Sequence, residues 1–253
     1  MKWIRDRVLN GEWLGGTFLN LGSSVTAEIA GKAGFDWLLI DIEHGMGDRQ
    51  EVLAQLQAIE GTPAAPIVRI AWNDLVLFKR VLDLGTSGVM VPCVNSGDEA
   101  RHAAAAMRYP PDGVRGVARL NRACDFGPSF SEYFKDANSK LLTVVQIETT
   151  TAVEACPEIA SVNGVDVLFV GPLDLSVSLG VPDQFDHPAV QSALSNVAKA
   201  ARQAGKAAGI LVANESQLNQ VKALGFTFVA LGSDGGAVVR EMRATASLLR
   251  SHR

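Results

Sequence analysis

Short apolar segments alternate with amphipathic ones along most of the chain. Runs of four to eight β-branched and aliphatic residues, bounded by turn residues, are typical of strands buried on both faces of a parallel sheet. The pattern predicts strands at residues 13–19, 35–40, 66–70, 88–94, 142–148, 165–170, 207–212 and 226–231. Polar caps followed by helical periodicity predict helices at residues 2–10, 24–33, 97–107, 150–162, 187–204, 215–224 and 235–250, with others beginning at 48 and at 73 or 74.

Eight strands alternating with eight helices are the pattern of a (β/α)₈ barrel, also called a TIM barrel. The length of 253 residues suits one such domain, and no boundary interrupts the series, so we assign residues 1–253 to a single domain. The alternative is an open doubly wound sheet, whose GxGxxG signature after a strand is absent. Residues 109–140 lack clear periodicity apart from a short helix near 130–137, and a segment of this kind is usually a functional loop.

Composition narrows the classes of partner and location. Hydrophobic residues make up 47% of the chain and charged residues 20%, with a net charge of -4, which argues against a nucleic-acid partner. No apolar run approaches the roughly 18 residues of a membrane span, and the N-terminus does not read as a signal peptide, so we expect a cytoplasmic protein. The three cysteines have no metal-binding spacing and are expected to be reduced.

Two carboxylates stand where predicted strands end. Glu148 closes the run 142–148, and Asp174 follows the run 165–170. If these strands are neighbours, their backbones lie about 4.8 Å apart, close enough for both carboxylates to bind one hard cation. Such oxygen ligands suit Mg²⁺ or Mn²⁺ better than Zn²⁺.

Other polar residues follow apolar strands in the same way. Asp41 and His44 come after the second strand, Arg69 ends the third, and Gln146 lies in the fifth. Each alone could be a helix cap or a surface ion pair, but together they occupy the strand ends where barrels carry their chemistry. His44 is suited to acid–base work, with Asp41 orienting its ring, and Arg69 is suited to stabilising a carboxylate or an enolate oxygen.

No lysine falls inside an apolar strand run. Schiff-base aldolases of the barrel type need such a lysine. If this barrel performs carbonyl chemistry, a metal ion must therefore stabilise the enolate.

Several motifs then match one family in order: GFDW with DIEH at 34–44, VR with WND at 68–74, YPPDGVRG at 109–116, VQIET at 145–149, GPLDLS at 171–176 and GILVANE at 209–215. On these motifs the chain resembles the HpcH/HpaI family of metal-dependent class II pyruvate aldolases over nearly its whole length. The resemblance implies reversible cleavage of a 4-hydroxy-2-oxo acid into an aldehyde and pyruvate, or a close 2-oxo acid such as hydroxypyruvate.

The resemblance also assigns roles to residues. It implies that Glu148 and Asp174 bind the divalent metal, Mg²⁺ or Mn²⁺ with Co²⁺ as a third candidate, and that the metal chelates the 2-oxo acid. It makes His44, paired with Asp41, the catalytic base, acting on the substrate or through a metal-bound water. Arg69 would stabilise the enolate oxygen.

Substrate binding and assembly follow from the same resemblance. It implies that Gln146 and the segment Gly171, Pro172 and Leu173 position the substrate. It further implies a homo-oligomer, a hexamer built as a trimer of dimers, in which the last helix packs on a neighbouring subunit and Asp83 reaches a neighbour's active site.

Two positions depart from the family pattern, because Ile42 and Leu173 are bulkier than the residues usual there. Both would narrow the site and so affect the choice of substrate more than the chemistry, and the poorly matched loop 119–133 is expected to help select the aldehyde.

Two alternative functions stay open. One is an acyl-CoA lyase related to the citrate-lyase β subunit, although no Lys/Arg cluster for a nucleotide is evident near the strand ends. The other is a barrel that binds a metabolite without catalysis.

Overall fold

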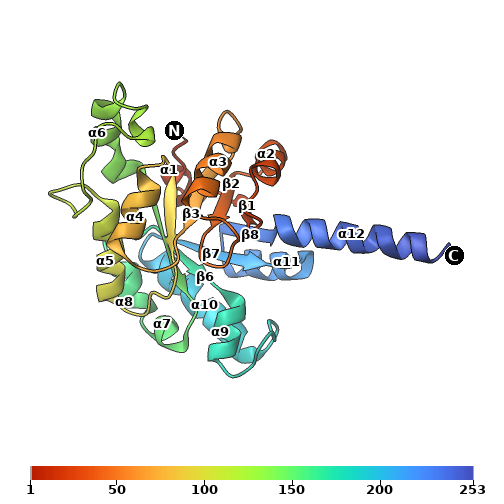
Figure 1. Ribbon diagram of the computed structural model, residues 1–253. Coiled ribbons are helices and arrows are strands. Elements are labelled where there is room, and N and C mark those ends of the chain that lie inside the picture. The colour runs from red at the N-terminus through yellow and green to blue at the C-terminus, as the bar shows by residue number, and fades with distance from the viewer. Residues whose placement is uncertain (1, 253) are drawn as a thin grey trace.

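Eight parallel strands close into a barrel in the computed structural model, which describes residues 2–252 (Figure 1). Each strand pairs with the next along the chain, and the last pairs with the first. The strands are β1 Leu14–Leu19, β2 Trp37–Asp41, β3 Ala65–Arg69, β4 Gly88–Val91, β5 Leu142–Ile147, β6 Val167–Val170, β7 Ala207–Val212 and β8 Phe228–Ser233. The (β/α)₈ barrel is therefore confirmed and the open sheet is excluded. Residues 1 and 253 of the predicted domain lie outside the described part.

Helices follow the strands and surround the barrel, except α12, which projects away from it (Figure 1). They are α1 Arg5–Leu9, α2 Ser24–Lys32, α3 Arg49–Ile59, α4 Leu75–Leu82, α5 Gly97–Met107, α6 Phe130–Lys140, α7 Thr150–Glu154, α8 Cys156–Ser161, α9 Pro172–Ser178, α10 Pro188–Gln203, α11 Glu215–Leu224 and α12 Asp234–Arg250, with a 3₁₀ turn at Arg122–Cys124. Several begin at the caps expected from the sequence: the side chains of Ser23, Asp48, Asp74 and Ser96 accept backbone N–H groups of α2, α3, α4 and α5. None of the helices in residues 2–252 is long and apolar enough to cross a membrane.

Two helical segments differ from the sequence-based expectation. The helix expected at 150–162 is two short helices, α7 and α8, and Pro157 lies in the first turn of the second. A proline fits there because its missing N–H would have no partner in a first turn. The segment after β6, which we expected to be a strand end, is the helix α9, with Pro172 as its first residue. Asp174 therefore lies in the first turn of a helix and not at the end of a strand.

The barrel interior is filled by large aromatic side chains. The rings of Trp37 and Phe228 stack with their centroids 4.0 Å apart, and Phe169 packs edge-on against both. Ile4 and Val8, which flank and belong to α1, join the same buried cluster and help close the barrel at the amino ends of the strands. The interior is therefore a packed core, and chemistry is left to the rims.

Gly16 in β1 makes room for this aromatic stack. A Cβ atom at this position would lie 2.3 Å from two ring atoms of Trp37, closer than real contacts allow. The preceding residue, Gly15, has open space at the corresponding position.

We predict that Gly16→Ala lowers the free energy of unfolding by about 1–3 kcal/mol, because the buried Trp37 ring cannot move away without disturbing its stack. Gly15→Ala is the matched control and should change stability by less than about 0.5 kcal/mol. Urea unfolding followed by far-UV circular dichroism measures both. Equal effects at the two positions would contradict the packing argument.

Candidate active site

A buried guanidinium joins the carboxyl ends of neighbouring strands. Arg69, at the end of β3, stands beside Asp41, at the end of β2, in the parallel register. Its Nε and Nη2 atoms donate to the two carboxylate oxygens of Asp41 at 2.9 and 2.8 Å, and both residues are less than a tenth exposed. Phe18 of β1 places its ring 5.3 Å from the guanidinium carbon. Burial alone would lower the pKa of Arg69, but the bonds and charge of Asp41 outweigh it and raise that pKa.

The same guanidinium is linked to the predicted metal ligand through one side chain. Nη1 of Arg69 donates to Gln146 Oε1 at 3.4 Å, and Gln146 Nε2 donates to Glu148 Oε2 at 2.9 Å. Gln146 and Glu148 are both buried. The orientation of the Glu148 carboxylate thus depends on Arg69 through Gln146.

The other oxygen of Glu148 is held by the loop after β4. The backbone N–H of Cys93 donates to Glu148 Oε1 at 2.7 Å. Cys93 has a φ of 54°, in the left-handed region, and Asn95 donates from Nδ2 to its carbonyl at 3.0 Å. Burial, followed by hydrogen bonding to the Glu148 carboxylate and the negative charge of that group, raises the pKa of the Cys93 thiol to about 12. The thiol therefore stays protonated near neutral pH, and the backbone amide carries the contact.

Asp174 reaches the same region from β6. This strand pairs directly with β5, as expected, with Ile147 opposite Val170. Asp174 lies in the first turn of α9, is exposed, and accepts no hydrogen bond from any described residue. Its negative charge adds, after those of Glu148 and Glu43, to the raised pKa of the Cys93 thiol.

Gly171 keeps the space beside Glu148 open. It is the N-cap of α9, and a Cβ atom there would lie 2.9 Å from Glu148 Oε2 and 3.4 Å from Gln146 Nε2. Pro172 is partly buried beside it, while the Leu173 side chain is 58% exposed. A side chain at position 171 would displace the carboxylate, so the glycine keeps the space beside Glu148 open.

The donor set fits a hard divalent cation. Glu148 is buried without an ion-pair partner among residues 2–252, and Asp174 has both oxygens available. Within that described range, no group of three or more His, Cys, Asp or Glu side chains could hold a metal ion. If Glu148 and Asp174 bind one ion, water and substrate oxygens would supply the remaining ligands, as is usual for Mg²⁺.

His44 lies at the edge of the site. Its side chain is 69% exposed, and its Nε2 atom is 3.7 Å from Glu43 Oε1. Asp41 does not orient the ring, contrary to our expectation: its carboxylate bonds Arg69 and accepts the backbone N–H groups of Glu43 and His44 at 3.1 and 3.4 Å. An aspartate at the start of a turn commonly accepts N–H groups of the backbone that follows it. Asp41 is occupied in this way, and the carboxylate near the His44 ring is that of Glu43.

Glu43 is therefore a site residue to which the sequence analysis gave no role. Burial raises its pKa, against the opposing charge of Arg69, and Glu148 adds to the rise. Its Oε2 atom lies 3.0 Å from Arg69 Nη1 but forms no aligned hydrogen bond with any described residue. The only signal in the sequence was its place between Asp41 and His44.

Asp83 does not join these residues within one chain. It is the C-cap of α4, which runs from the carboxyl end of β3 back towards the amino ends of the strands. Its carboxylate accepts from Arg115 Nη2 at 3.2 Å. The Arg115 side chain is completely buried, with its guanidinium over the rings of Tyr109 and Tyr133. In this chain Asp83 anchors the loop that carries the YPPDGVRG motif.

We predict that Asp41→Asn lowers the free energy of unfolding by about 3 kcal/mol, because it leaves the Arg69 charge buried with half its partner lost. Asp98→Asn is the matched control: Asp98 also pairs with an arginine, Arg101, but both side chains are largely exposed. That control should show no measurable change. Chemical unfolding of the metal-free proteins measures both, and an unchanged Asp41→Asn variant would contradict the proposed importance of the pair.

Comparison with known proteins identifies the family of this chain. The model of the family described as HpcH/HpaI aldolase/citrate lyase matches residues 15–240. A protein from Shigella sonnei (strain Ss046), named 4-hydroxy-2-oxo-heptane-1,7-dioate aldolase, is 45% identical over 232 residues, which cover 92% of this chain and 88% of the relative.

Solved structures agree with the sequence match. A HpcH/HpaI aldolase/citrate lyase family protein from Burkholderia cenocepacia J2315 has a TM-score of 0.93 and 37% identity, covering 98% of each chain. The HpcH/HpaI aldolase from Desulfitobacterium hafniense DCB-2 has a TM-score of 0.92 and 28% identity, covering 99% of this chain and 97% of that one. The resemblance drawn from the six groups of motifs is thus confirmed, and the chain belongs to the HpcH/HpaI aldolase/citrate lyase family.

Proposed function

We propose that this protein is a metal-dependent aldolase that cleaves 4-hydroxy-2-oxo acids reversibly to an aldehyde and pyruvate or a close 2-oxo acid. The observation that carries the proposal is the network in which Arg69 binds Asp41 and reaches Glu148 through Gln146. The relative from Shigella sonnei, named for the same type of reaction, supports it. These residues lie at the carboxyl ends of the strands, where barrel enzymes carry their active sites, and this also supports the proposal.

The proposed roles follow from what each side chain has available. A divalent ion bound by Glu148 and Asp174 would act as a Lewis acid towards the 2-oxo acid. Arg69 has five N–H donors, and the bonds to Asp41 and Gln146 use three of them. A remaining donor can stabilise the oxygen on which negative charge develops. The second N–H of Gln146 and the backbone amides around Gly171 and Leu173 would hold the substrate carboxylate.

His44 is the proposed base. It takes the proton from the C4 hydroxyl, the bond between C3 and C4 breaks, the aldehyde leaves, and the protonated His44 returns the proton to C3 of the enolate. The exposure of the ring allows it to meet a substrate that enters from solvent. The Glu43 carboxylate, whose Oε1 atom lies near the His44 ring, is positioned to stabilise the protonated ring.

We further propose Mg²⁺ or Mn²⁺ as the metal, a cytoplasmic location and one functional domain over residues 1–253. Leu173 and the loop 119–133 would influence which aldehyde is accepted. The Leu173 side chain is exposed, which supports a contact between it and the aldehyde.

Removal of the metal tests the proposal. We predict that protein stripped with EDTA releases pyruvate from 4-hydroxy-2-oxoheptanedioate at least about 100-fold more slowly than protein supplied with Mn²⁺. A coupled assay of pyruvate release, run without coenzyme A, measures this. Equal rates with and without metal would contradict the metal's role, and turnover only of a CoA thioester would favour the acyl-CoA lyase alternative.

A histidine variant tests the base. His44→Ala should bind Mn²⁺ with unchanged affinity but lose about 10²–10⁴-fold in the rate of methyl-proton exchange of pyruvate, which proton NMR in deuterated water measures. His102→Ala changes an exposed histidine on α5 and is the matched control. Unchanged exchange in His44→Ala would remove His44 as the base, and pyruvate binding without exchange in the unmodified protein would favour a non-catalytic barrel.

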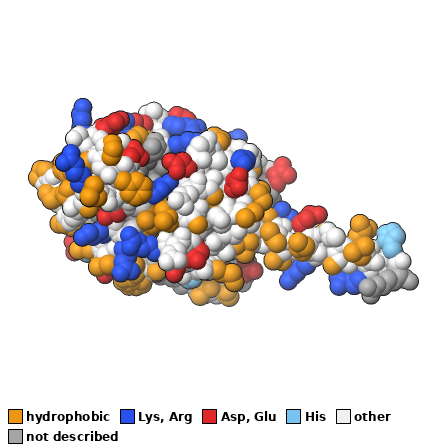
Figure 2. Space-filling model, turned by 45° about the horizontal axis from the view of Figure 1, so that its top comes forward, with side chains coloured by type: hydrophobic (Ala, Val, Ile, Leu, Met, Phe, Trp, Pro, Cys, Tyr) orange, Lys and Arg blue, Asp and Glu red, His pale blue; other side chains and the backbone are white. Residues whose placement is uncertain are grey.

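We also propose that α12 mediates assembly into a homo-oligomer, a hexamer by family resemblance. This helix of 17 residues leaves the barrel (Figure 1) and buries only Gly235, in its first turn. Val238, Val239, Met242 and Leu249 are exposed along it at helical spacing, and hydrophobic side chains are visible on the projecting helix in Figure 2. Such a stripe is typical of a helix that packs against another chain. Asp83 would then contribute to a neighbour's site.

Met242→Lys should therefore reduce the molar mass in solution, because it places a charge within the apolar stripe. Glu241→Lys introduces the same side chain one position earlier, outside the stripe, and should leave the assembly intact. Size-exclusion chromatography with light scattering measures both. The proposal is wrong if the unmodified protein is monomeric at micromolar concentration.

A further inference from the structure

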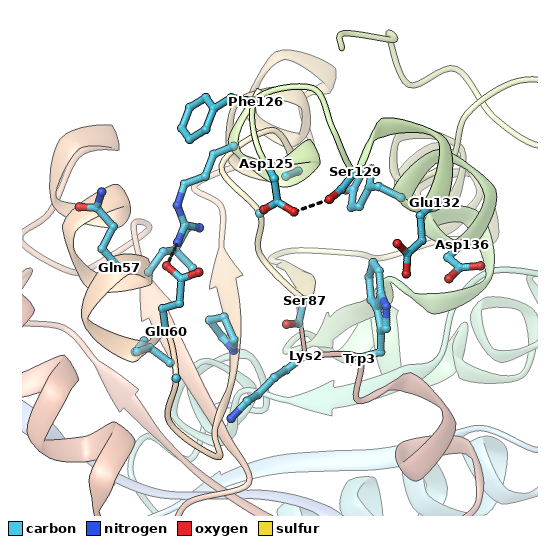
Figure 3. A pocket seen from close by; sticks show the side chains of 18 of the residues that line it. Lys2, Trp3, Gln57, Glu60, Ser87, Asp125, Phe126, Ser129, Glu132 and Asp136 are labelled. Carbon is cyan, nitrogen blue, oxygen red and sulfur yellow. Dashed lines mark hydrogen bonds and ion pairs between the residues drawn. The ribbon is translucent and has the colours of Figure 1, made fainter. Parts of the chain in front are cut away.

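A cavity lies at the amino ends of the strands, the end of the barrel opposite to the candidate active site. Its volume is about 680 Å³, and it is lined near the amino ends of β3 and β4 by Pro66 and Ser87. The segment before α1 contributes Trp3, and the loop before α6 contributes Phe126 (Figure 3). No residue of the proposed catalytic set lines this cavity, so the function proposed above does not account for it.

Ser87 gives the lining of this cavity a hydroxyl that has no hydrogen-bond partner among residues 2–252. Its backbone is satisfied, since its N–H donates to the carbonyl of Pro66 and its carbonyl accepts from Leu142. Its hydroxyl is fully buried and bonds no described residue, although it lines the cavity. A buried hydroxyl without a partner destabilises a protein, and each such case in a native fold calls for an explanation. A ligand that forms the missing hydrogen bond with Ser87 would explain why this hydroxyl has no partner within the chain.

The charges around the cavity are unbalanced. Four carboxylates and two cations line it, giving a net charge of -2; the cations are Lys2 and Arg122, and the carboxylates are Glu60, Asp125, Glu132 and Asp136. Arg122 pairs with Glu60 at 2.8 Å, and the Ser129 hydroxyl donates to Asp125. Glu132 and Asp136 form no ion pair within residues 2–252. An excess of negative charge therefore remains at the cavity.

The carboxylates lie at two separate places. In Figure 3, Glu132 and Asp136 lie on one side of the cavity and Glu60 on the other, with Ser87 between them. Glu132 and Asp136 are four residues apart on α6, so they share a helix face. The Trp3 ring stands next to them and is stacked on Tyr133, with centroids 6.0 Å apart. An aromatic face beside carboxylates is a favourable environment for an ammonium group.

We infer that this cavity binds an organic diamine, a short apolar body with an ammonium group at each end. One ammonium is held by Glu132 and Asp136 against the Trp3 ring. The other lies between the two sides of the cavity and donates to the Ser87 hydroxyl. The ligand's charge of +2 balances the lining, and its apolar body packs on Ile59 and Pro66. A phosphate or a carboxylate ligand would meet the same excess charge as repulsion.

Titration calorimetry on the metal-loaded full chain tests this inference, with 1,4-diaminobutane as the probe. We expect one diamine bound per chain, with 1-aminobutane at least about fivefold weaker and 1,4-butanediol without measurable binding. The affinity for the diamine should be the same with and without EDTA, because the cavity is remote from the metal ligands. Equal binding of diamine and diol, or no binding of the diamine at millimolar concentration, would overturn the inference.

Variants identify the site. Glu132→Gln combined with Asp136→Asn should weaken diamine binding about tenfold or more, whereas Glu154→Gln, an exposed carboxylate on α7, should leave it unchanged. Ser87→Ala should weaken binding while leaving the melting temperature of the free protein unchanged or higher, because it removes an unpartnered hydroxyl. A lower melting temperature for Ser87→Ala, or undiminished binding by the α6 double variant, would contradict the assignment.

Discussion

The buried Arg69 guanidinium is the interaction on which the candidate site depends. Its bond to Asp41 fixes the ends of β2 and β3 relative to each other, and its contact with Gln146 extends that order to β5. Because the charge is buried, its partners cannot leave without a large cost. The positions of Glu148 and Glu43 are therefore set by the same pair that holds the strands in register.

The two ends of the barrel carry different groups of residues. At the carboxyl ends, the short loops after β4 and β6 approach Glu148: the backbone of Cys93 holds one of its oxygens, and Gly171 leaves space beside the other. The aromatic core between the two ends isolates them from each other. The amino ends carry the cavity around Ser87, whose acidic lining differs from the network of paired charges at the candidate active site.

Much of this could be predicted from the sequence, because parallel strands buried on both faces leave a strong apolar signal and end at one rim. That is why Glu148 and Arg69 could be located in advance, and why β5 and β6 could be expected as neighbours. Asp174 was misplaced because four residues after β6 could be loop or helix, and local hydrophobicity does not distinguish them. The backbone conformation of Cys93 leaves no compositional signal, since non-glycine residues seldom adopt it. The link from Asp41 to Arg69, rather than to the His44 ring, is a tertiary contact across strands that spacing cannot reveal.

We infer that the Arg69–Asp41 pair, acting through Gln146, sets the geometry of Glu148, the proposed metal ligand. The most direct measurement is the dissociation constant for Mn²⁺ of Gln146→Leu compared with the unmodified protein, determined by electron paramagnetic resonance of free Mn²⁺. Loss of a hydrogen bond that orients a metal-binding carboxylate typically weakens binding about 10–100-fold. We predict a weakening in that range with the fold retained, as judged by circular dichroism. An unchanged dissociation constant in a folded variant would contradict the account.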